Sequence, residues 1–382
     1  MRELISAKTK AAIRFFEGGR SNHEQMTEDV ARLLLGMNLE CARCHNHPNV
    51  RDYKQAHFFG IYAYLKQTKL SRDKKKMPIL IETAAKSKTE YQSVFAKVKR
   101  FIGPQLPDGM EISTPLENPR QLLARDLTAT KNKRFARNSV NRFWFMMMGR
   151  GLVHPLDFDH SRNPPSHPKL LEILTDDFIA HKFDVRHLLR EIALSQAYQR
   201  SGELPEGVKA SSVKPESYRV AIAKGLSAEQ MAWRLMRATG NLERISKQPA
   251  PKQSKFTHKD YINGRIPTPD NLIDVMTLFT ATFGSPAGEA ETEIAPSASQ
   301  ALFPMNEKLV LDWLKPRKGS LVSRLIAIKD PKELTRELYL ATLSRLPEAE
   351  EVEMITNFLE QHKAKRDSAV GDAVWALLTS AE

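Results

Sequence analysis

The stretch Cys41-Ala42-Arg43-Cys44-His45-Asn46-His47-Pro48 contains both cysteines of the 382-residue chain. The two thiols are spaced C-x-x-C and a histidine follows the second one directly, which is the pattern by which a polypeptide attaches haem covalently. Random placement of two cysteines and 11 histidines in 382 positions would produce this pattern on the order of once in ten thousand trials. The stretch therefore predicts a site for haem c.

The chemistry of such a site explains the spacing. Two thiols add to the two vinyl groups of the haem, so Cys41 and Cys44 have to lie one short turn apart, and His45 can then give the iron an axial imidazole nitrogen. A helix is predicted directly before the turn, with Ser21 and Glu24 spaced as a capping box at its start. Its apolar stripe at helical spacing consists of Met26, Val30, Leu33, Leu34 and Met37.

Two other chemistries use similar residues. Two thiolates and two imidazoles are a ligand set for tetrahedral zinc, and Cys41, Cys44, His45 and His47 supply them. Seven residues are a tight span for four ligands, because zinc fingers usually separate their ligand pairs by about a dozen residues. A redox disulfide is the third interpretation, although that motif usually opens a helix in a strand-helix-strand setting, which is not predicted here.

The composition limits the class of protein. The formal net charge is +13, but Lys and Arg are spread along the chain without a nucleic-acid-binding signature, so we expect a solvated basic surface and no nucleic acid partner. No run of 18 apolar residues predicts a transmembrane helix, and residues 1–8 lack the apolar core of a signal peptide. Because bacteria attach haem through thioethers outside the cytoplasm, we expect this chain to be the C-terminal part of a longer exported protein, located in the periplasm or another extracytoplasmic space.

Aromatic residues are dense directly after the motif, namely Tyr53, Phe58, Phe59, Tyr62 and Tyr64. They are candidates for the flat apolar walls that a haem pocket needs, although the same pattern is typical of an ordinary helix in a core. His57 and Met77 are candidates for the second axial ligand of the iron. A lone histidine or methionine more often has a packing role.

Proline and glycine divide the chain. Residues 66–115 look irregular except for a short candidate strand, Ile79-Leu80-Ile81, and we place a domain boundary near Pro115. Residues 1–115 then form the C-x-x-C-H domain and residues 116–382 a second domain. Residues 246–300, rich in Pro, Ser, Lys and Thr, are expected to be a long linker or surface excursion. The predicted fold is mainly α-helical, with long irregular loops in the second domain.

The second domain opens with a basic helix and a polar loop. The helix is expected near residues 132–148, with basic residues at its start and flank: Lys133, Arg134, Arg137 and Arg142. The loop that follows holds the candidate binding residues Arg150, Asp157, Asp159, His160 and His167. Alternatively, Ser166 of this loop only caps a helix that begins at Pro168. No nucleophile and base lie in register, so no catalytic constellation is predicted.

Several of these segments together resemble a known family. Residues 41–48 (CARCHNHP), 132–144 (NKRFARNSVNRFW), 149–153 (GRGLV), 164–168 (PPSHP) and 194–201 (LSQAYQRS) are similar, in the same order, to the planctomycete cytochrome-like proteins. In these, a C-x-x-C-H domain of unknown function precedes a second uncharacterised domain. The resemblance implies an exported protein, usually with a signal peptide and often with a further cytochrome-like domain. Only Cys41, Cys44 and His45 carry over as the haem-binding set.

Three functions are therefore expected, in order of preference. The first is an electron-transfer protein with haem c ligated by His45 and with a redox partner protein. The second is a non-redox binding module, with structural zinc at the cysteine motif and a basic surface that docks an anionic extracellular polysaccharide or a partner protein. The third is an enzyme acting through the polar loop from Asp157 to His167.

Overall fold

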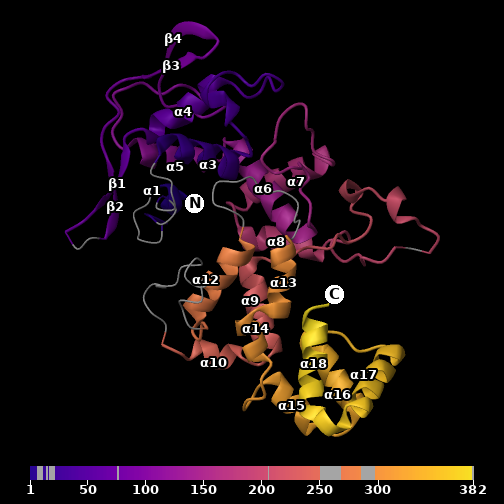
Figure 1. The fold of residues 1–382 in the computed structure, drawn as a ribbon. Helices are drawn as coiled ribbons and strands as arrows, with labels where there is room; N and C mark the ends of the chain where they lie inside the picture. The colour runs from indigo at the N-terminus through magenta and orange to yellow at the C-terminus, as the bar shows by residue number, and fades with distance from the viewer. Residues whose placement is uncertain are drawn as a thin grey trace. The chain divides into compact units, whose positions relative to one another are not determined.

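The computed structural model describes residues 1–6, 12–13, 16, 22–74, 77–204, 206–249, 268–284 and 297–380. Helices dominate these residues, and paired strands form two small hairpins (Figure 1), which confirms the predicted mainly α-helical fold. The described residues fall into two compact units, unit 1 up to Lys224 and unit 2 from Gly225 onward. The boundary predicted near Pro115 stays a prediction about how the sequence is organised.

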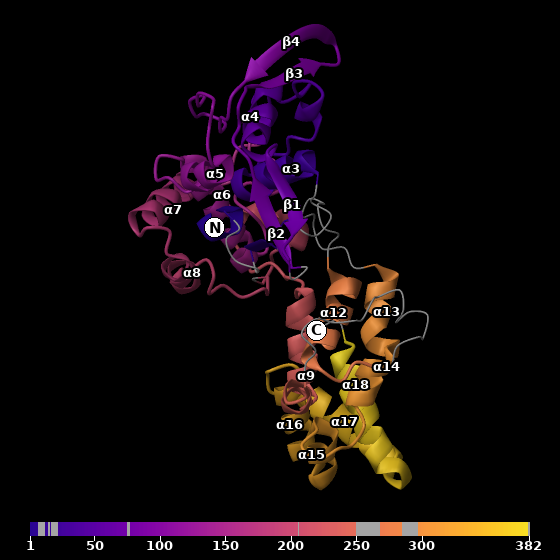
Figure 2. The ribbon, with the colours of Figure 1, turned by 90° about the vertical axis from the view of Figure 1, so that its left-hand side faces the viewer.

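The first part of unit 1 contains helices and both hairpins. Its helices are α1 (Arg2–Ser6), α3 (His23–Leu35), the 3₁₀ turn η1 (Cys41–Arg43), α4 (Gln55–Leu65) and α5 (Pro119–Leu127). Its strands are β1 (Thr68–Arg72), β2 (Pro78–Glu82), β3 (Thr89–Ser93) and β4 (Ala96–Ile102). The pairs β1–β2 and β3–β4 are antiparallel, with Lys69 opposite Ile81 and Tyr91 opposite Arg100. The β3–β4 hairpin lies next to α4 (Figure 2).

Helix α3 leads the chain to the cysteine motif. The predicted apolar stripe is confirmed, because Met26, Val30 and Leu34 are buried. The cap differs from the prediction: the Asn22 side chain accepts the hydrogen bond from the Glu24 N–H, and Ser21 lies outside the described residues. Gly36 ends the helix at φ +68°, and a Cβ there would lie 2.8 Å from Oδ1 of Asn138, so both the backbone and the close packing require glycine.

The aromatic residues after the motif belong to the core. Tyr53, Phe58 and Tyr64 are at most 1% exposed and pack with the stripe of α3, so of the two interpretations the structure supports the helix in a core and not the wall of a haem pocket. The physical reason is that α4 is almost wholly apolar and is covered on several sides. Phe59 stacks on Tyr91 of β3 with ring centres 4.9 Å apart, which joins the helix to the second hairpin.

The remainder of unit 1 is built on α6 (Lys133–Met148), α7 (Pro168–Ala180) and α8 (Val185–Leu194), followed by the short turns η2 (Ala210–Ser212) and η3 (Pro215–Ser217). The buried side chains of these three helices form one core, which includes Val140, Trp144, Leu171, Phe178 and Leu188. The prediction that Ser166 caps α7 is wrong. His167 is the N-cap residue and makes no side-chain cap, while the Ser166 hydroxyl lies 3.1 Å from Nδ1 of His167.

Unit 2 is helical in its described residues: α9 (Ala228–Ala238), α10 (Leu242–Ser246), α12 (Leu272–Phe283), α13 (Ala298–Asn306), α14 (Lys308–Trp313), α15 (Leu321–Ala327), α16 (Pro331–Thr342), α17 (Ala349–Gln361), η4 (Lys363–Lys365) and α18 (Arg366–Leu378). Val275, Leu278 and Phe279 of α12 are fully buried against α9 and α14. Residues 272–283 are thus a core helix, which corrects the linker or surface excursion predicted at 246–300 for this part. Residues 250–267 and 285–296 of that segment lie outside the described residues.

Candidate functional site

The C-x-x-C-H motif forms a tight turn at the surface of unit 1. Cys41 and Cys44 are both free thiols and both exposed, whereas Ala42 between them is buried. The backbone N–H groups of Cys44 and His45 each donate to the carbonyl of Cys41 at 3.2 Å. The turn therefore presents two sulfur atoms to the outside and anchors itself through the methyl group between them.

A buried glutamine fixes this turn to its surroundings. The side-chain amide of Gln55, the first residue of α4, donates to the carbonyl of Arg43 at 3.3 Å and to the carbonyl of Gln92 at 3.1 Å. The backbone N–H of Gln55 donates to the Asn46 side chain at 2.8 Å. Gln55 is only 4% exposed, so these bonds hold the turn, α4 and β3 together away from water.

Gln55→Ala is expected to lower the free energy of unfolding of unit 1 by about 1–3 kcal/mol, because two partly buried carbonyls lose their donor. Urea denaturation followed by circular dichroism measures the loss. Gln92→Ala is the matched control, since it removes an exposed side chain and keeps the carbonyl to which Gln55 donates. Equal effects of the two substitutions would show that the Gln55 amide does not hold the turn.

The hydrogen bond of His45 determines which of its nitrogens can bind a metal. Nδ1 of His45 lies 2.7 Å from the carbonyl oxygen of Asn46. A carbonyl only accepts, so Nδ1 carries the proton, and in the neutral ring Nε2 is left with the lone pair that a metal needs. Histidine ligands are usually oriented in this way, with the second nitrogen bonded to a backbone carbonyl or carboxylate.

An apolar hairpin tip adjoins the motif. The N–H of Val94 donates to the carbonyl of Cys44 at 3.0 Å, and the Phe95 ring packs on the His45 ring with centres 5.0 Å apart. The exposed apolar residues of the hairpin are Val94, Phe95, Val98 and Phe101, each more than half exposed. The sequence predicted no such surface, although an apolar pair at a hairpin turn is itself unusual, because turns favour polar residues and glycine.

A cation stands beside the second thiol. The pKa of Arg43 is raised, and the neighbouring Cys44 side chain is the main cause. The Arg43 guanidinium lies 3.3 Å from a carboxylate oxygen of Glu24 and 3.6 Å from one of Glu28, both on α3. Arg43 is therefore held over the turn from the preceding helix.

The alternative zinc ligands do not converge on one point. All four of them lie in the described part of the chain, yet no three of their ligand atoms come within 4.8 Å of one another. Nδ1 of His47 accepts hydrogen bonds from the N–H groups of Asn49 at 3.2 Å and Val50 at 3.0 Å. His47 thus shapes the chain after the motif, and its Nδ1 is already used.

The two candidates for the sixth ligand of the iron are His57, on α4, and Met77, directly before β2. His57 lies in the first turn of α4, where its Nδ1 accepts a hydrogen bond from the Lys54 N–H at 3.5 Å and where burial lowers its pKa. Met77 precedes β2 in the first hairpin and is 37% exposed. Ligation of iron by either residue stays a prediction.

The polar loop is largely structural. Asp157 is 1% exposed and pairs with Arg142 of α6 and, at 3.5 Å, with Arg32 of α3. Asp159 forms a two-point ion pair with Arg137 at 3.0 and 3.3 Å. These carboxylates therefore join α3, α6 and the loop. This network accounts for two of the loop residues that the sequence proposed for binding.

The rest of the loop contacts the segment after the motif. The His160 ring meets the Tyr53 ring edge-on at 5.4 Å, and burial lowers the pKa of His160. His167 packs against Tyr218, whose hydroxyl donates to the carbonyl of Arg150 at 3.1 Å. A cavity of about 410 Å³ is lined by Pro48, Asn49, Arg51, Ser161 and Arg162, so Pro48 is the apolar residue among the described residues of its lining.

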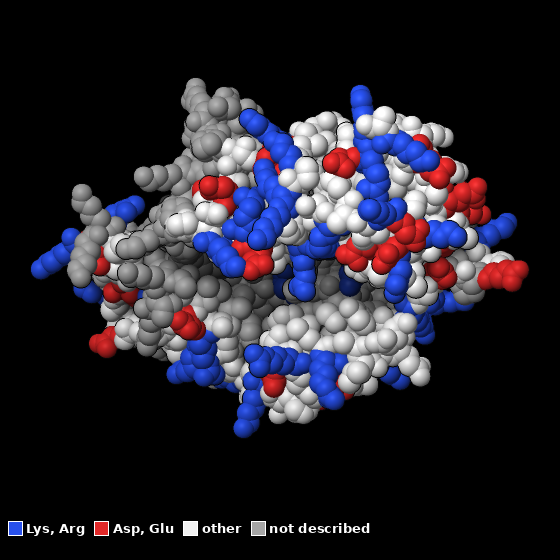
Figure 3. Space-filling view, turned by 90° about the horizontal axis from the view of Figure 1, so that it is seen from below, with Lys and Arg blue, Asp and Glu red and all other residues white. Residues whose placement is uncertain are grey.

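The basic residues at the start and flank of α6 are paired with carboxylates. Lys133 bonds to Asp176 at 2.8 Å and Arg134 to Asp108 at 3.0 Å. On the face of the molecule shown in Figure 3, Lys and Arg are likewise interleaved with Asp and Glu. The pairing fits the solvated basic surface that the composition predicted.

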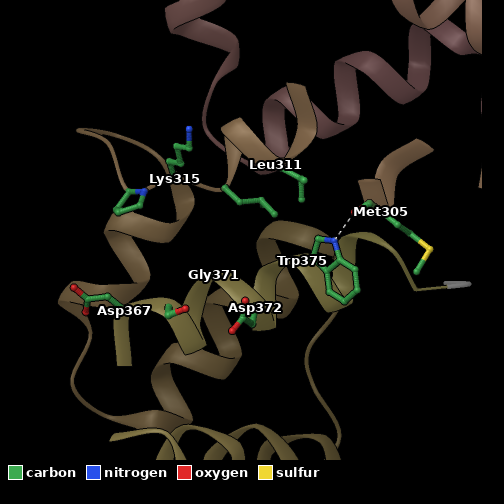
Figure 4. Close-up of a pocket in the computed structure, with 10 residues that line it drawn as sticks. Met305, Leu311, Lys315, Asp367, Gly371, Asp372 and Trp375 are labelled. Atoms are coloured by element: carbon green, nitrogen blue, oxygen red, sulfur yellow. Dashed lines mark hydrogen bonds between the residues drawn. The ribbon is translucent and has the colours of Figure 1, made fainter. Parts of the chain in front are cut away.

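The larger cavity lies in unit 2 and has a volume of about 600 Å³. Trp375 of α18 forms part of its wall and donates its indole N–H to the carbonyl of Met305 at 3.1 Å (Figure 4). Asp367, Asp372 and Lys315 place charges around it. No histidine or cysteine is among the described residues that line it, so it offers no strong iron ligand.

These features define a mainly helical protein with a C-x-x-C-H turn at its surface. The chain belongs to the PSD1 family, proteins of unknown function (DUF1553), whose model matches residues 119–359, more than half of the chain. A second model, PSCyt2, a protein of unknown function (DUF1549), matches residues 7–70 and so includes the turn. Both matches confirm the resemblance to the planctomycete cytochrome-like proteins. No curated protein and no solved structure matches the chain.

Among the helices of the described segments, none combines the length and the apolar character that crossing a membrane requires.

Proposed function

We propose that this chain binds haem c covalently through Cys41 and Cys44, with Nε2 of His45 as an axial ligand, and that it serves as an electron-transfer component of an exported assembly. One observation carries the proposal. Two free, exposed thiols, an imidazole whose Nδ1 lies against a backbone carbonyl and so leaves Nε2 for a metal in the neutral ring, and an exposed apolar hairpin tip meet on one surface of unit 1.

The residues around the turn suit a flat apolar group. Large exposed apolar side chains next to a polar motif are unfavourable in water, and a porphyrin ring would cover them. Phe95 already packs against the His45 ring at 5.0 Å, so an apolar surface adjoins the proposed iron ligand. The buried core aromatics of α4 would support the turn from below and would not touch the haem.

Each residue then has a distinct role. Cys41 and Cys44 hold the haem, His45 binds the iron, and the carbonyl of Asn46 keeps the His45 ring in the correct tautomer. Gln55 holds the turn and the β3–β4 hairpin in position relative to each other through its two side-chain hydrogen bonds. The haem supplies one-electron chemistry, and the protein sets its potential through the axial ligand and exposure to water. A surface haem would also let a redox partner protein approach closely.

The cellular compartment that we propose for the protein follows from the way haem c is attached. Thioether attachment of haem requires a maturation machinery that works outside the cytoplasm in bacteria, so the proposed site is periplasmic or extracytoplasmic. The cytochrome-like family model that includes the motif supports this proposal. The partner would be another redox protein of the same compartment.

Export of the chain behind a signal peptide, in cells with haem-maturation machinery, tests the proposal. We expect the intact mass to rise by one haem and a Soret band to appear. Cys41→Ala with Cys44→Ala should remove both signals. His45→Ala should keep the attached mass and alter the spectrum, because the thioethers remain while the axial nitrogen is lost. His47→Ala, the matched control, should change neither signal.

A protein without haem mass and without a Soret band, although maturation of a control cytochrome succeeds in the same cells, would refute the proposal. One zinc ion per chain that is lost in both His45→Ala and His47→Ala would instead support the structural metal site. Metal analysis of the purified protein distinguishes the two results.

A further inference from the structure

The junction between α7 and α8 brings together three side chains that the sequence did not single out. An oxygen of the Asp177 carboxylate lies 3.2 Å from Nδ1 of His181, and the other oxygen lies 2.9 Å from Nε2 of His187. The two imidazole rings stack with centres 3.7 Å apart. One ligand atom from each residue lies within 4.8 Å of the other two, and no other such group occurs among the residues that the structure describes.

Local structure holds these three residues in place. Asp177 and His181 lie one turn apart at the end of α7, and His181 is its C-cap. The Asp184 carboxylate caps α8 by accepting hydrogen bonds from the N–H groups of Arg186 at 2.9 Å and His187 at 3.2 Å. The backbone of His187 is therefore fixed by the first turn of its helix.

The connection between the helices is anchored in the core. The Phe183 ring contacts those of Phe135 at 5.9 Å and Phe178 at 5.4 Å. Lys182 and Phe183 have φ values of 54° and 62°, so the chain reverses sharply between the two histidines. The junction lies at an outer edge of unit 1 (Figure 2), and His181 is exposed while Asp177 and His187 are half-buried.

The two N···O separations resemble those within a metal coordination shell. Neighbouring ligands of a zinc ion bound at about 2.0–2.1 Å lie about 3–3.5 Å apart, which is close to the two N···O separations here. Two imidazoles with one carboxylate suit zinc and similar first-row ions, whereas magnesium and calcium favour sets made only of oxygen. Three protein ligands at an exposed edge leave a fourth position open to water.

We propose that Asp177, His181 and His187 bind one zinc ion or a similar divalent transition-metal ion. In the structure, the Asp177 carboxylate hydrogen-bonds Nε2 of His187, whereas Nδ1 of His181 lies 3.0 Å from the backbone carbonyl of Asp177 and 3.2 Å from its carboxylate. A bound cation would take the place of the ring protons at these two nitrogens. The site lies on other elements than the C-x-x-C-H turn, so it does not depend on the haem proposal.

Calorimetric titration with Zn²⁺ tests this site. A tag-free chain with Cys41→Ala and Cys44→Ala removes competing thiolates, and we expect it to bind one zinc ion. His181→Ala with His187→Ala should weaken binding at least about 100-fold, because loss of a ligand exceeds the tenfold to 100-fold effect of losing an outer-shell partner. Asp177→Asn should also weaken binding. Circular dichroism shows whether each variant is folded.

His362→Ala is the matched control. Nδ1 of His362, at the end of α17, lies 2.8 Å from the carbonyl of Phe358, as Nδ1 of His181 lies 3.0 Å from that of Asp177. His362 belongs to no three-ligand group within the described ranges. Its replacement should leave the affinity unchanged. No zinc binding by the cysteine-free chain, or equal affinity after loss of both cluster histidines, would overturn the proposal.

Discussion

Asp157→Asn is expected to lower the free energy of unfolding of unit 1 by about 3–5 kcal/mol. The Asp157 carboxylate is 1% exposed and pairs with Arg142 and Arg32, whose side chains are only 16% and 10% exposed. Asparagine keeps the shape of the side chain and removes its charge. Both buried guanidinium groups would then lose this carboxylate, although Arg32 keeps that of Asp29 at 3.2 Å. Removing one member of a buried ion-pair network is strongly destabilising.

Urea denaturation measures this effect, and hydrogen exchange of the α3 and α6 amides localises it, because Arg32 and Arg142 lie on these helices. Asp176→Asn is the matched control, since it makes the same chemical change in an exposed pair with Lys133. Exposed pairs contribute about 0–1 kcal/mol. A loss of less than about 1 kcal/mol in Asp157→Asn would show that this network does not hold α3, α6 and the loop together.

Local patterns account for what the sequence predicted well. The stripe of Met26, Val30 and Leu34 depends only on helical spacing, and the structure buries it. The cysteine motif is likewise defined by neighbouring residues, so its position on a turn after α3 could be predicted. Whether the turn is exposed depends on what packs over it, and only the structure shows that Cys41 and Cys44 are both accessible.

Pairings over long distances in the sequence explain what was missed. Asp157 looked like a binding residue of a loop because nothing local indicates that it meets Arg32, which lies more than a hundred residues earlier. The second hairpin was also missed, although buried and exposed residues alternate along β3, because its apolar residues Val94 and Phe95 stand at a turn, where polar residues and glycine are usual. The cluster of Asp177, His181 and His187 needs the reversal between two helices, which sequence spacing alone does not define.

The predicted linker at residues 246–300 failed for a compositional reason. Pro, Ser, Lys and Thr dominate the segment as a whole. Val275, Leu278 and Phe279 nevertheless follow the i, i+3, i+4 spacing of a buried helical face, and the structure places them in the core of unit 2. A composition averaged over a long segment conceals such a short amphipathic helix.

Phe279→Ala tests this correction directly and is expected to destabilise unit 2 by about 3–5 kcal/mol. The Phe279 side chain is fully buried, and its ring lies 5.2 Å from that of Phe303 and 6.2 Å from the nearly parallel ring of Trp313. Truncation would leave a cavity that these large rings cannot fill by small movements. Urea denaturation followed by tryptophan fluorescence measures the loss of stability, because Trp313 is itself fully buried beside the space that the Phe279 ring would leave.

Leu302→Ala is the control within the same unit, because this apolar side chain of α13 is 51% exposed and its loss should change the stability by only about 0.5 kcal/mol. The contrast between the two variants decides what α12 is. A linker or surface excursion would tolerate both substitutions equally, since neither would remove a core contact. A core helix requires Phe279 for the packing of α9, α12 and α14, so only its replacement should shift the unfolding midpoint of unit 2.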